Sequence, residues 1–186
     1  VSEVTNPGAP VPSFGFPVLN AAELTIDGIE FEGVALLREA TRLSTQLGWM
    51  DARYDKFVDP RVDLNPALAN LHDHVPFSPE FTARVALQHS FSLANGSTFS
   101  VGADASYRSE TWLSVDNRPG LTEDGYLIGN LYAQVDFDKF YLLGAVKNVG
   151  NTLYKTDGQE FSSVGNIQTV YYGDPRTWNV TVGVRF

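Results

Sequence analysis

Three histidines and two glutamates are the residues of this 186-residue chain whose positions first suggest chemistry. His72-Asp73-His74 places two imidazoles and a carboxylate in consecutive positions, and both are ligand types that Zn²⁺ takes. His89 is distant in sequence, and the surrounding segment is rich in proline, so a solvated loop is favoured over a metal site. We therefore expect no metal and no other cofactor.

Glu30 and Glu32 could form a carboxylate pair of the kind used in general acid–base catalysis. They stand two positions apart in a segment that alternates like a strand, so they share one polar face, and lining that face is favoured over catalysis. The chain has no cysteine, no Gly-x-Ser-x-Gly nucleophile motif, and no P-loop or dinucleotide-binding fingerprint. We therefore expect that the protein is not an enzyme.

Composition narrows the class of protein further. A net charge of −9 with thirteen scattered Lys and Arg residues argues against a nucleic-acid partner. Sixteen Gly and many aromatic residues favour strands and turns over helices. No run of 18 apolar residues exists, which excludes a transmembrane helix but not transmembrane strands. The chain begins at Val1 without a secretory signal, so it is expected to be either a mature product or a chain whose front is missing.

Period-two alternation of apolar and polar residues predicts seven strands, after a Pro- and Gly-rich loop over residues 1–20. The expected strands are 23–37, 41–57, 80–93, 98–113, 126–137, 140–154 and 176–186. The phase slips near Asp27-Gly28, where we expect a bulge. The facing of 140–154 cannot be assigned, because both parities hold apolar residues. Most of these strands are long for a soluble sheet.

Connections of two lengths alternate along the chain. The short ones fall near Arg38, at Asn95-Gly96 and at Asp138-Lys139, and the long ones span 58–79, 117–125 and 156–175. Transmembrane β-barrels have this pattern, with short turns on one side of the membrane and long loops on the other. The C-terminus then falls on the short-turn side.

The last expected strand has one apolar and one polar face. Its apolar positions are Trp178, Val180, Val182, Val184 and Phe186. An aromatic terminal residue with apolar residues at every second position before it resembles the C-terminal assembly signal of bacterial outer-membrane barrels. Aromatic residues near the ends of several strands are typical of the interfacial girdles of a barrel.

The polar faces of the expected strands would line the lumen of such a barrel. The candidates are Glu30, Glu32, Arg84, Gln88, Asp104, Arg108, Asn130, Gln134 and Arg185. His89 alone interrupts the apolar face of its strand, and it would be tolerated there only near a membrane interface.

Six short strings extend this comparison to a family. They are Ile26-Asp-Gly-Ile-Glu-Phe-Glu-Gly33, Leu47-Gly-Trp49 through Asp51-Ala-Arg-Tyr54, Phe77-Ser-Pro-Glu80, Ser106-Tyr-Arg-Ser109, Val146-Lys-Asn-Val149 with Tyr154, and Gly173-Asp-Pro-Arg-Thr-Trp178 to Arg185-Phe186. In their order and spacing they resemble the C-terminal third of a TonB-dependent outer-membrane receptor. The resemblance covers nearly the whole chain past about Ala21.

The resemblance implies an all-β fold of antiparallel, up-and-down transmembrane β-barrel strands. About seven or eight strands would form part of a 22-stranded receptor barrel, with residues 1–186 as its C-terminal portion and the plug domain absent. The implied partners are outer-membrane lipid, the plug domain and remaining strands of the same protein, the TonB complex and the barrel-assembly machinery. The implied location is the outer membrane of a Gram-negative bacterium.

By the same resemblance, the complete protein would import a scarce, bulky nutrient such as a ferric siderophore, a cobalamin or an oligosaccharide. The long loops would meet this ligand first. The loop residues that could contact it are His72, His74, Phe161, Tyr171 and Tyr172.

Two alternatives stay open at the level of sequence. The first is a small, self-contained outer-membrane barrel with an eighth strand in residues 1–17 or 156–175, acting as a pore or structural protein. The second is a soluble all-β binding module whose apolar faces pack on each other.

Overall fold

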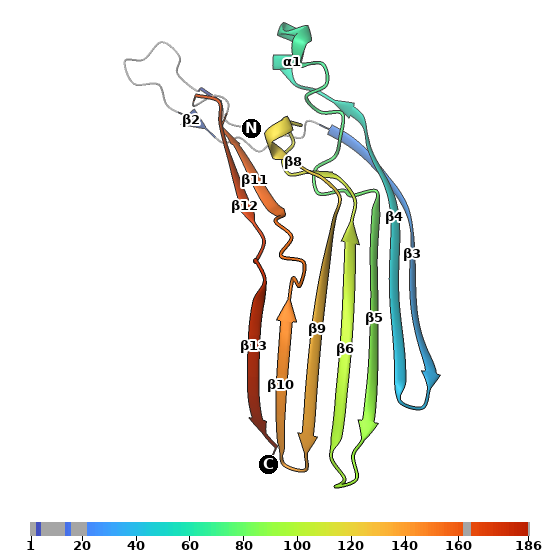
Figure 1. Ribbon diagram of the computed structural model, residues 1–186. Helices are drawn as coiled ribbons and strands as arrows, with labels where there is room; N and C mark the ends of the chain where they lie inside the picture. The colour runs from blue at the N-terminus through green and yellow to red at the C-terminus, as the bar shows by residue number, and fades with distance from the viewer. Residues whose placement is uncertain (1–2, 5–13, 16–21, 162–164, 186) are drawn as a thin grey trace.

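Seven antiparallel strands form one large, curved sheet in the computed structural model, which describes residues 3–4, 14–15, 22–161 and 165–185 (Figure 1). The strands are β3 (Ala22–Arg38), β4 (Thr41–Phe57), β5 (Phe81–Ser92), β6 (Thr98–Arg108), β9 (Tyr126–Phe137), β10 (Phe140–Lys147) and β13 (Thr177–Val184). Their order across the sheet follows the chain, from β3 at one edge to β13 at the other. The predicted fold class, antiparallel up-and-down barrel strands, is therefore confirmed.

Smaller elements occupy the long connections. They are α1 (Pro60–Leu64), the 3-10 helices η1 (Pro66–Leu68) and η2 (Pro119–Leu121), and three two-stranded pairings: β1 (Glu3–Val4) with β2 (Phe14–Gly15), β7 (Thr111–Trp112) with β8 (Thr122–Glu123), and β11 (Lys155–Phe161) with β12 (Ile167–Tyr172). No helix within the described ranges is both long and apolar enough to cross a membrane.

Three predicted elements are wrong in their bounds. The strand expected over 98–113 ends at Arg108, and Thr111–Trp112 forms the separate strand β7, which pairs with β8 outside the large sheet. The strand expected over 140–154 ends at Lys147, because Asn148 adopts a positive φ of 49° that a strand cannot continue. The loop expected over 156–175 instead contains the β11–β12 hairpin, which turns at Gly165 and Asn166, both at positive φ. In the segment expected to be a loop over 1–20, β1 and β2 pair, and the rest lies outside the described residues.

The strand register assigns the faces of every strand, including β10. Residues directly opposite each other in an antiparallel pair share a face. Leu142 lies opposite Val135 on one side and Val182 on the other, so the even-numbered residues of β10 belong to the apolar face. The same register joins Phe31, Leu47, Ala83, Tyr107 and Leu127 in one apolar row across the sheet.

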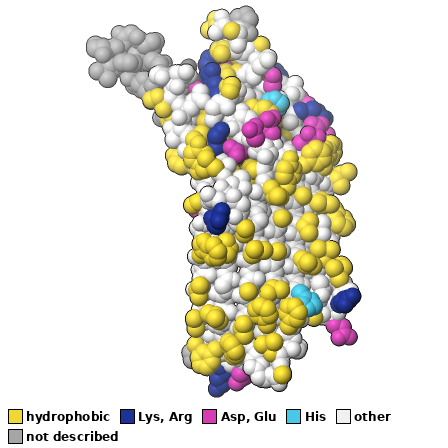
Figure 2. Space-filling model, viewed as in Figure 1, with side chains coloured by type: hydrophobic (Ala, Val, Ile, Leu, Met, Phe, Trp, Pro, Cys, Tyr) yellow, Lys and Arg dark blue, Asp and Glu magenta, His cyan; other side chains and the backbone are white. Residues whose placement is uncertain are grey.

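Most of the large hydrophobic side chains on the apolar face of the sheet are exposed, and none of them is buried. Val180 and Val182 are 75% and 72% exposed, and Figure 2 shows hydrophobic side chains spread over this face, with charged ones gathered mainly toward one end. The buried hydrophobic residues of the described chain are Leu71, Val75, Leu113 and Leu121, and none of them lies in the sheet. The sheet therefore has no core of its own, and another layer must cover its apolar face.

The bulge expected at Asp27-Gly28 is absent from the register. Asp27 lies opposite Asp51, and Gly28 lies opposite Met50, without interruption; the shifts occur at Glu23/Leu24 and Leu36/Arg38. The alternation is interrupted by the types of residue at these positions and not by a bulge. Asp27 and Asp51 occupy apolar-face positions, and both bind Arg53 at 3.1 and 2.7 Å in exposed ion pairs.

We predict that Val182→Asp impairs assembly of the complete protein into membranes. The residue lies on the apolar face, where a carboxylate facing lipid costs up to about 2 kcal/mol at mid-bilayer depth and less near an interface. The measurement is the folded fraction recovered in the membrane, with Thr181→Asp, on the opposite face, as the matched control. Equal recovery of both variants would contradict the facing assigned here.

Candidate functional site

Three long segments meet at one end of the sheet, opposite the short turns and the C-terminus (Figure 1). We call this region the loop end: segments 58–79, 109–125 and 148–175. All four buried hydrophobic residues lie in the first two of these segments. The loop end is therefore the part of the described chain that has an interior.

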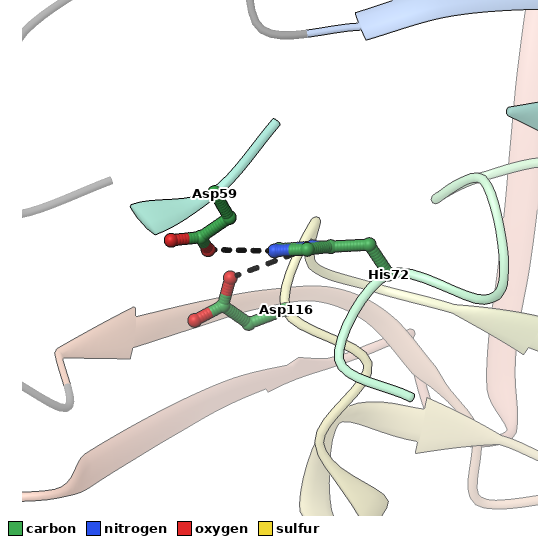
Figure 3. A group of neighbouring side chains, drawn as sticks. All are labelled: Asp59, His72 and Asp116. Atoms are coloured by element: carbon green, nitrogen blue, oxygen red, sulfur yellow. Dashed lines mark hydrogen bonds and ion pairs between the residues drawn. The ribbon is translucent and has the colours of Figure 1, made fainter. Parts of the chain in front are cut away.

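A cluster of four charged or titratable side chains, Asp59, Arg61, His72 and Asp116, joins the first two segments. Figure 3 shows three of them, Asp59, His72 and Asp116. Asp59 caps the N-terminus of α1 and accepts a hydrogen bond from the backbone N–H of Arg61 at 2.8 Å. The Arg61 guanidinium donates to Asp59 at 2.7 Å and to both oxygens of Asp116 at 2.9 Å. His72 Nε2 lies 2.8 Å from Asp59 Oδ2, and Nδ1 lies 2.9 Å from the carbonyl oxygen of Val115.

Burial makes this cluster different from a surface ion pair. The side chains of Asp59, His72 and Asp116 are 8%, 6% and 7% exposed. The Phe57 ring stacks on the imidazole of His72, with centroids 3.9 Å apart. Removing one partner from such a group leaves an uncompensated buried charge, so the cluster fixes segment 58–79 against segment 109–125.

The donor atoms of Asp59, His72 and Asp116 lie within 4.8 Å of one another, as in a metal site. Two observations argue against a metal. Arg61 already places its positive charge on both carboxylates, and His72 directs both ring nitrogens at oxygen acceptors. The cluster contains its own cation, and its residues do not fit a bound metal as they stand.

The sequence prediction for His72-Asp73-His74 is wrong in one respect. His74 is exposed, as a loop residue should be, and stacks on Trp112 with centroids 3.5 Å apart. His72 is not solvated, because it turns inward to Asp59. The two imidazoles therefore have separate surroundings and do not converge on one site.

The carboxyl group of Asp59 is strongly perturbed. Burial alone would raise its pKa, but hydrogen bonds from Arg61 and His72 outweigh it and hold the pKa well below its usual range. The same pairing raises the pKa of Arg61, chiefly through its hydrogen bonds to Asp59. Asp59 is therefore ionised over the whole physiological range.

The third segment docks on the second through the β11–β12 hairpin. Lys155 Nζ donates to the carbonyl oxygen of Thr122 at 2.6 Å, and Arg118 approaches Glu160 at 3.7 Å. Gly158 lies so close to buried Leu113 and Leu121 that a Cβ there would come within 3.0 Å of both. A side chain at this position would therefore push the hairpin away from the small core.

Asn148 fixes the start of this third segment. It is 3% exposed, its backbone N–H donates to Asn130 Oδ1 at 3.0 Å, and its side-chain amide donates to the carbonyl oxygens of Thr152 and Asp174. It therefore ties the end of β10, the approach to β11 and the approach to β13 to β9.

Eight of the nine residues expected to line a lumen share the face opposite the apolar one, by register. The ninth, Arg185, follows β13 and reaches this face through its ion pair with Asp136. They form polar contacts there: Asp104 accepts from Arg84 at 3.4 Å and from Asn130 at 3.1 Å, and Arg185 binds Asp136 at 2.7 Å. A groove lined in part by Glu30, Glu32, Arg84 and Arg108 crosses this face. That this face lines a lumen stays a prediction.

The other predicted site residues are placed as follows. Phe161, Tyr171 and Tyr172 lie on the β11–β12 hairpin, away in sequence from the two histidines, and both tyrosines are about half exposed. Trp178, Val180, Val182 and Val184 lie on the apolar face of β13, whereas Phe186 lies outside the described residues. The roles of these residues in ligand contact and barrel assembly stay predictions.

No protein-family model and no curated protein sequence matches the chain. Solved structures match it in fold. BauA, the ferric preacinetobactin receptor from Acinetobacter baumannii, is 18% identical over 99% of the chain, with a TM-score of 0.69. FyuA, the ferric yersiniabactin uptake receptor from Yersinia pestis, is 15% identical over 90% of the chain, with a TM-score of 0.75.

The ferripyoverdine receptor of the outer membrane of Pseudomonas aeruginosa is 17% identical over 99% of the chain, with a TM-score of 0.64. The chain spans about a quarter of the length of each of these three proteins. Its fold is therefore that of part of an outer-membrane receptor. The fold of this segment therefore confirms the resemblance to TonB-dependent outer-membrane receptors that the sequence suggested.

We predict that Arg61→Gln loosens the loop end. The substitution leaves the buried carboxylates of Asp59 and Asp116 without their guanidinium, which costs on the order of 2 kcal/mol or more of local stability. Amide hydrogen exchange of residues 58–79 should accelerate accordingly. Arg53→Gln is the control, because Arg53 also pairs with aspartates but is 48% exposed, and its loss should leave the exchange of residues 58–79 unchanged.

We also predict that acid opens this cluster. Because the pKa of Asp59 is lower in the folded than in the unfolded state, its contribution to stability is complete above the unfolded value of about 3.9 and is lost as the pH falls toward the folded value. Cleavage of segment 58–79 by pepsin should therefore rise progressively below about pH 4. In Asp59→Asn, pepsin should cleave the segment readily already at about pH 4, and the rate of cleavage should rise less on further acidification. An acid profile equal to that of the wild type would show that Asp59 is not the source of the acid sensitivity.

Proposed function

We propose that the chain is the C-terminal portion of a TonB-dependent receptor in the outer membrane of a Gram-negative bacterium. The observation that carries the proposal is the seven-stranded sheet with one exposed apolar face, which matches a quarter of several receptor structures at TM-scores of 0.64 to 0.75. In the complete protein, outer-membrane lipid covers the apolar face and the polar face lines the lumen.

The open sheet supports a fragment of a larger barrel over a small complete one. Its edge strands β3 and β13 pair on one side only in the described part of the chain, and lipid-exposed sheet edges leave backbone groups unsatisfied. Segment 156–175 forms a separate hairpin at the loop end, where it does not serve as an eighth strand of the sheet. The remaining strands of the same protein would close the barrel around a plug domain.

The exposed apolar face of the sheet also argues against the alternative of a soluble all-β binding module. A sandwich would pack a second sheet on the apolar residues, and the described residues provide no such sheet. Val180 and Val182 stay largely exposed, as lipid-facing residues of a barrel strand would in the absence of lipid.

The proposed activity is uptake of a scarce, bulky nutrient by the complete protein, rather than enzymatic catalysis. The barrel-assembly machinery would insert the protein, and the TonB complex would supply energy through the part that precedes this chain. A ferric siderophore is the favoured cargo over a cobalamin or an oligosaccharide, because the matched structures include ferric siderophore receptors.

The test starts with the reading frame upstream of Val1, which should encode a signal peptide, a plug domain and about fifteen further strands. A strain carrying the complete gene should then take up a ferric siderophore only when TonB is functional. Uptake that persists without TonB would indicate a passive pore. A signal peptide joined directly to Val1 would overturn the receptor proposal altogether.

A further inference from the structure

His72 holds a buried position between two loop-end segments. Its Nε2 faces Asp59 Oδ2 at 2.8 Å on segment 58–79, and its Nδ1 faces the carbonyl oxygen of Val115 at 2.9 Å on segment 109–125. Both partners are acceptors only. Each of the two contacts therefore requires a proton on the nitrogen that makes it.

A neutral imidazole carries one N–H and cannot satisfy both acceptors. With the proton on Nδ1, the Nε2 lone pair would face the Asp59 carboxylate. With the proton on Nε2, the Nδ1 lone pair would face the Val115 carbonyl, with Asp116 Oδ1 also only 3.9 Å away. The imidazolium form alone completes the observed arrangement.

We propose that His72 is a proton-operated latch between segments 58–79 and 109–125. The latch is closed when the ring carries both protons, and losing one of them releases one side. The charged groups facing the ring are Asp59 and Arg61 from the start of α1 and Asp116 from the opposite segment. Phe57 covers the ring on its stacked side.

The latch is one of several contacts between the two segments. They are also joined by Arg61, which donates to both oxygens of Asp116, by the Asn117 backbone N–H donating to the Leu71 carbonyl, and by the Asn117 side chain bonding the backbone of His74. Asn117 directly follows Asp116, so a shift at the latch is transmitted to these bonds. Opening would expose Leu71 and Val75 of the small core.

The latch rests on this geometry alone, whereas its consequence rests on the proposed receptor function. In a receptor, the loop end meets the ligand first, and an open loop end presents a different surface from a closed one. The latch would make ligand capture depend on the acidity outside the cell.

The experiment measures the distance between the two segments without any ligand. This part of the chain has no cysteine, so Asp73→Cys and Pro119→Cys, both at exposed positions, introduce spin labels into the complete protein in detergent or bilayer. Pulsed electron spin resonance at about pH 5.5 and about pH 8.5 should show the separated population growing about tenfold or more at the higher pH, as expected for loss of one charge-assisted hydrogen bond.

Two variants identify the responsible histidine. His72→Gln should abolish the pH response, because a glutamine does not titrate here, and His74→Gln should retain it as the matched control on the same segment. A wild-type distance that does not change with pH, or a response that persists in His72→Gln, would overturn the latch.

A second measurement uses the wild-type protein, so it does not depend on whether a variant assembles. Nitrogen-15 histidine spectra of the wild-type protein should show protons on both ring nitrogens of His72 in the closed form. A neutral ring in the closed form would overturn the proposal. Neither result depends on transport, so a failed latch and a failed receptor proposal are distinguishable.

Discussion

The seven-stranded sheet contains no buried hydrophobic residue, and the rest of the structure depends on this fact. A single sheet presents two faces, and here one carries a continuous set of apolar side chains that nothing in the described chain covers. Each Å² left in water forfeits about 25 cal/mol of burial free energy. The sheet is therefore stable only with an external apolar layer, and the edge strands β3 and β13 likewise require further strands to satisfy their backbone groups.

The loop end differs from the sheet because its segments are polar and lie beyond the apolar face, so they must bury polar and charged groups. Four buried apolar residues form a small core there, and the buried carboxylates of Asp59 and Asp116 are both paired with Arg61. The largely buried carboxylate of Glu160 lies 3.7 Å from Arg118, too far for a hydrogen bond. Pairing matters here because burial of an isolated charge is costly. The three segments form a folded cap, which is a better-defined surface for a ligand than three independent loops.

Sequence periodicity predicted the sheet because one physical rule, alternation, acts at every strand position. It also separated the two faces correctly in six strands, and only cross-strand register could assign β10, where both parities are apolar. The cluster at the loop end gave no such signal. Arg61 and Asp116 lie 55 positions apart, and the β11–β12 hairpin forms in a Gly- and Ser-rich stretch whose strands gain from docking on Leu113 and Leu121. Contacts between residues that are far apart in sequence produce no periodic pattern, so sequence analysis could not detect them.

Arg61 and His72 have different parts in the loop-end cluster. Arg61 keeps its charge at any relevant pH and contacts both carboxylates, so it supplies permanent cohesion. A second arginine or a lysine at position 72 would make the joint permanent on both sides. An imidazole makes it conditional, because it is the one side chain whose ordinary titration falls near neutral pH. The arrangement thus combines a constant contact from Arg61 to Asp116 with a proton-dependent contact from His72 to the Val115 carbonyl, and near neutral pH only the second can respond to the surroundings.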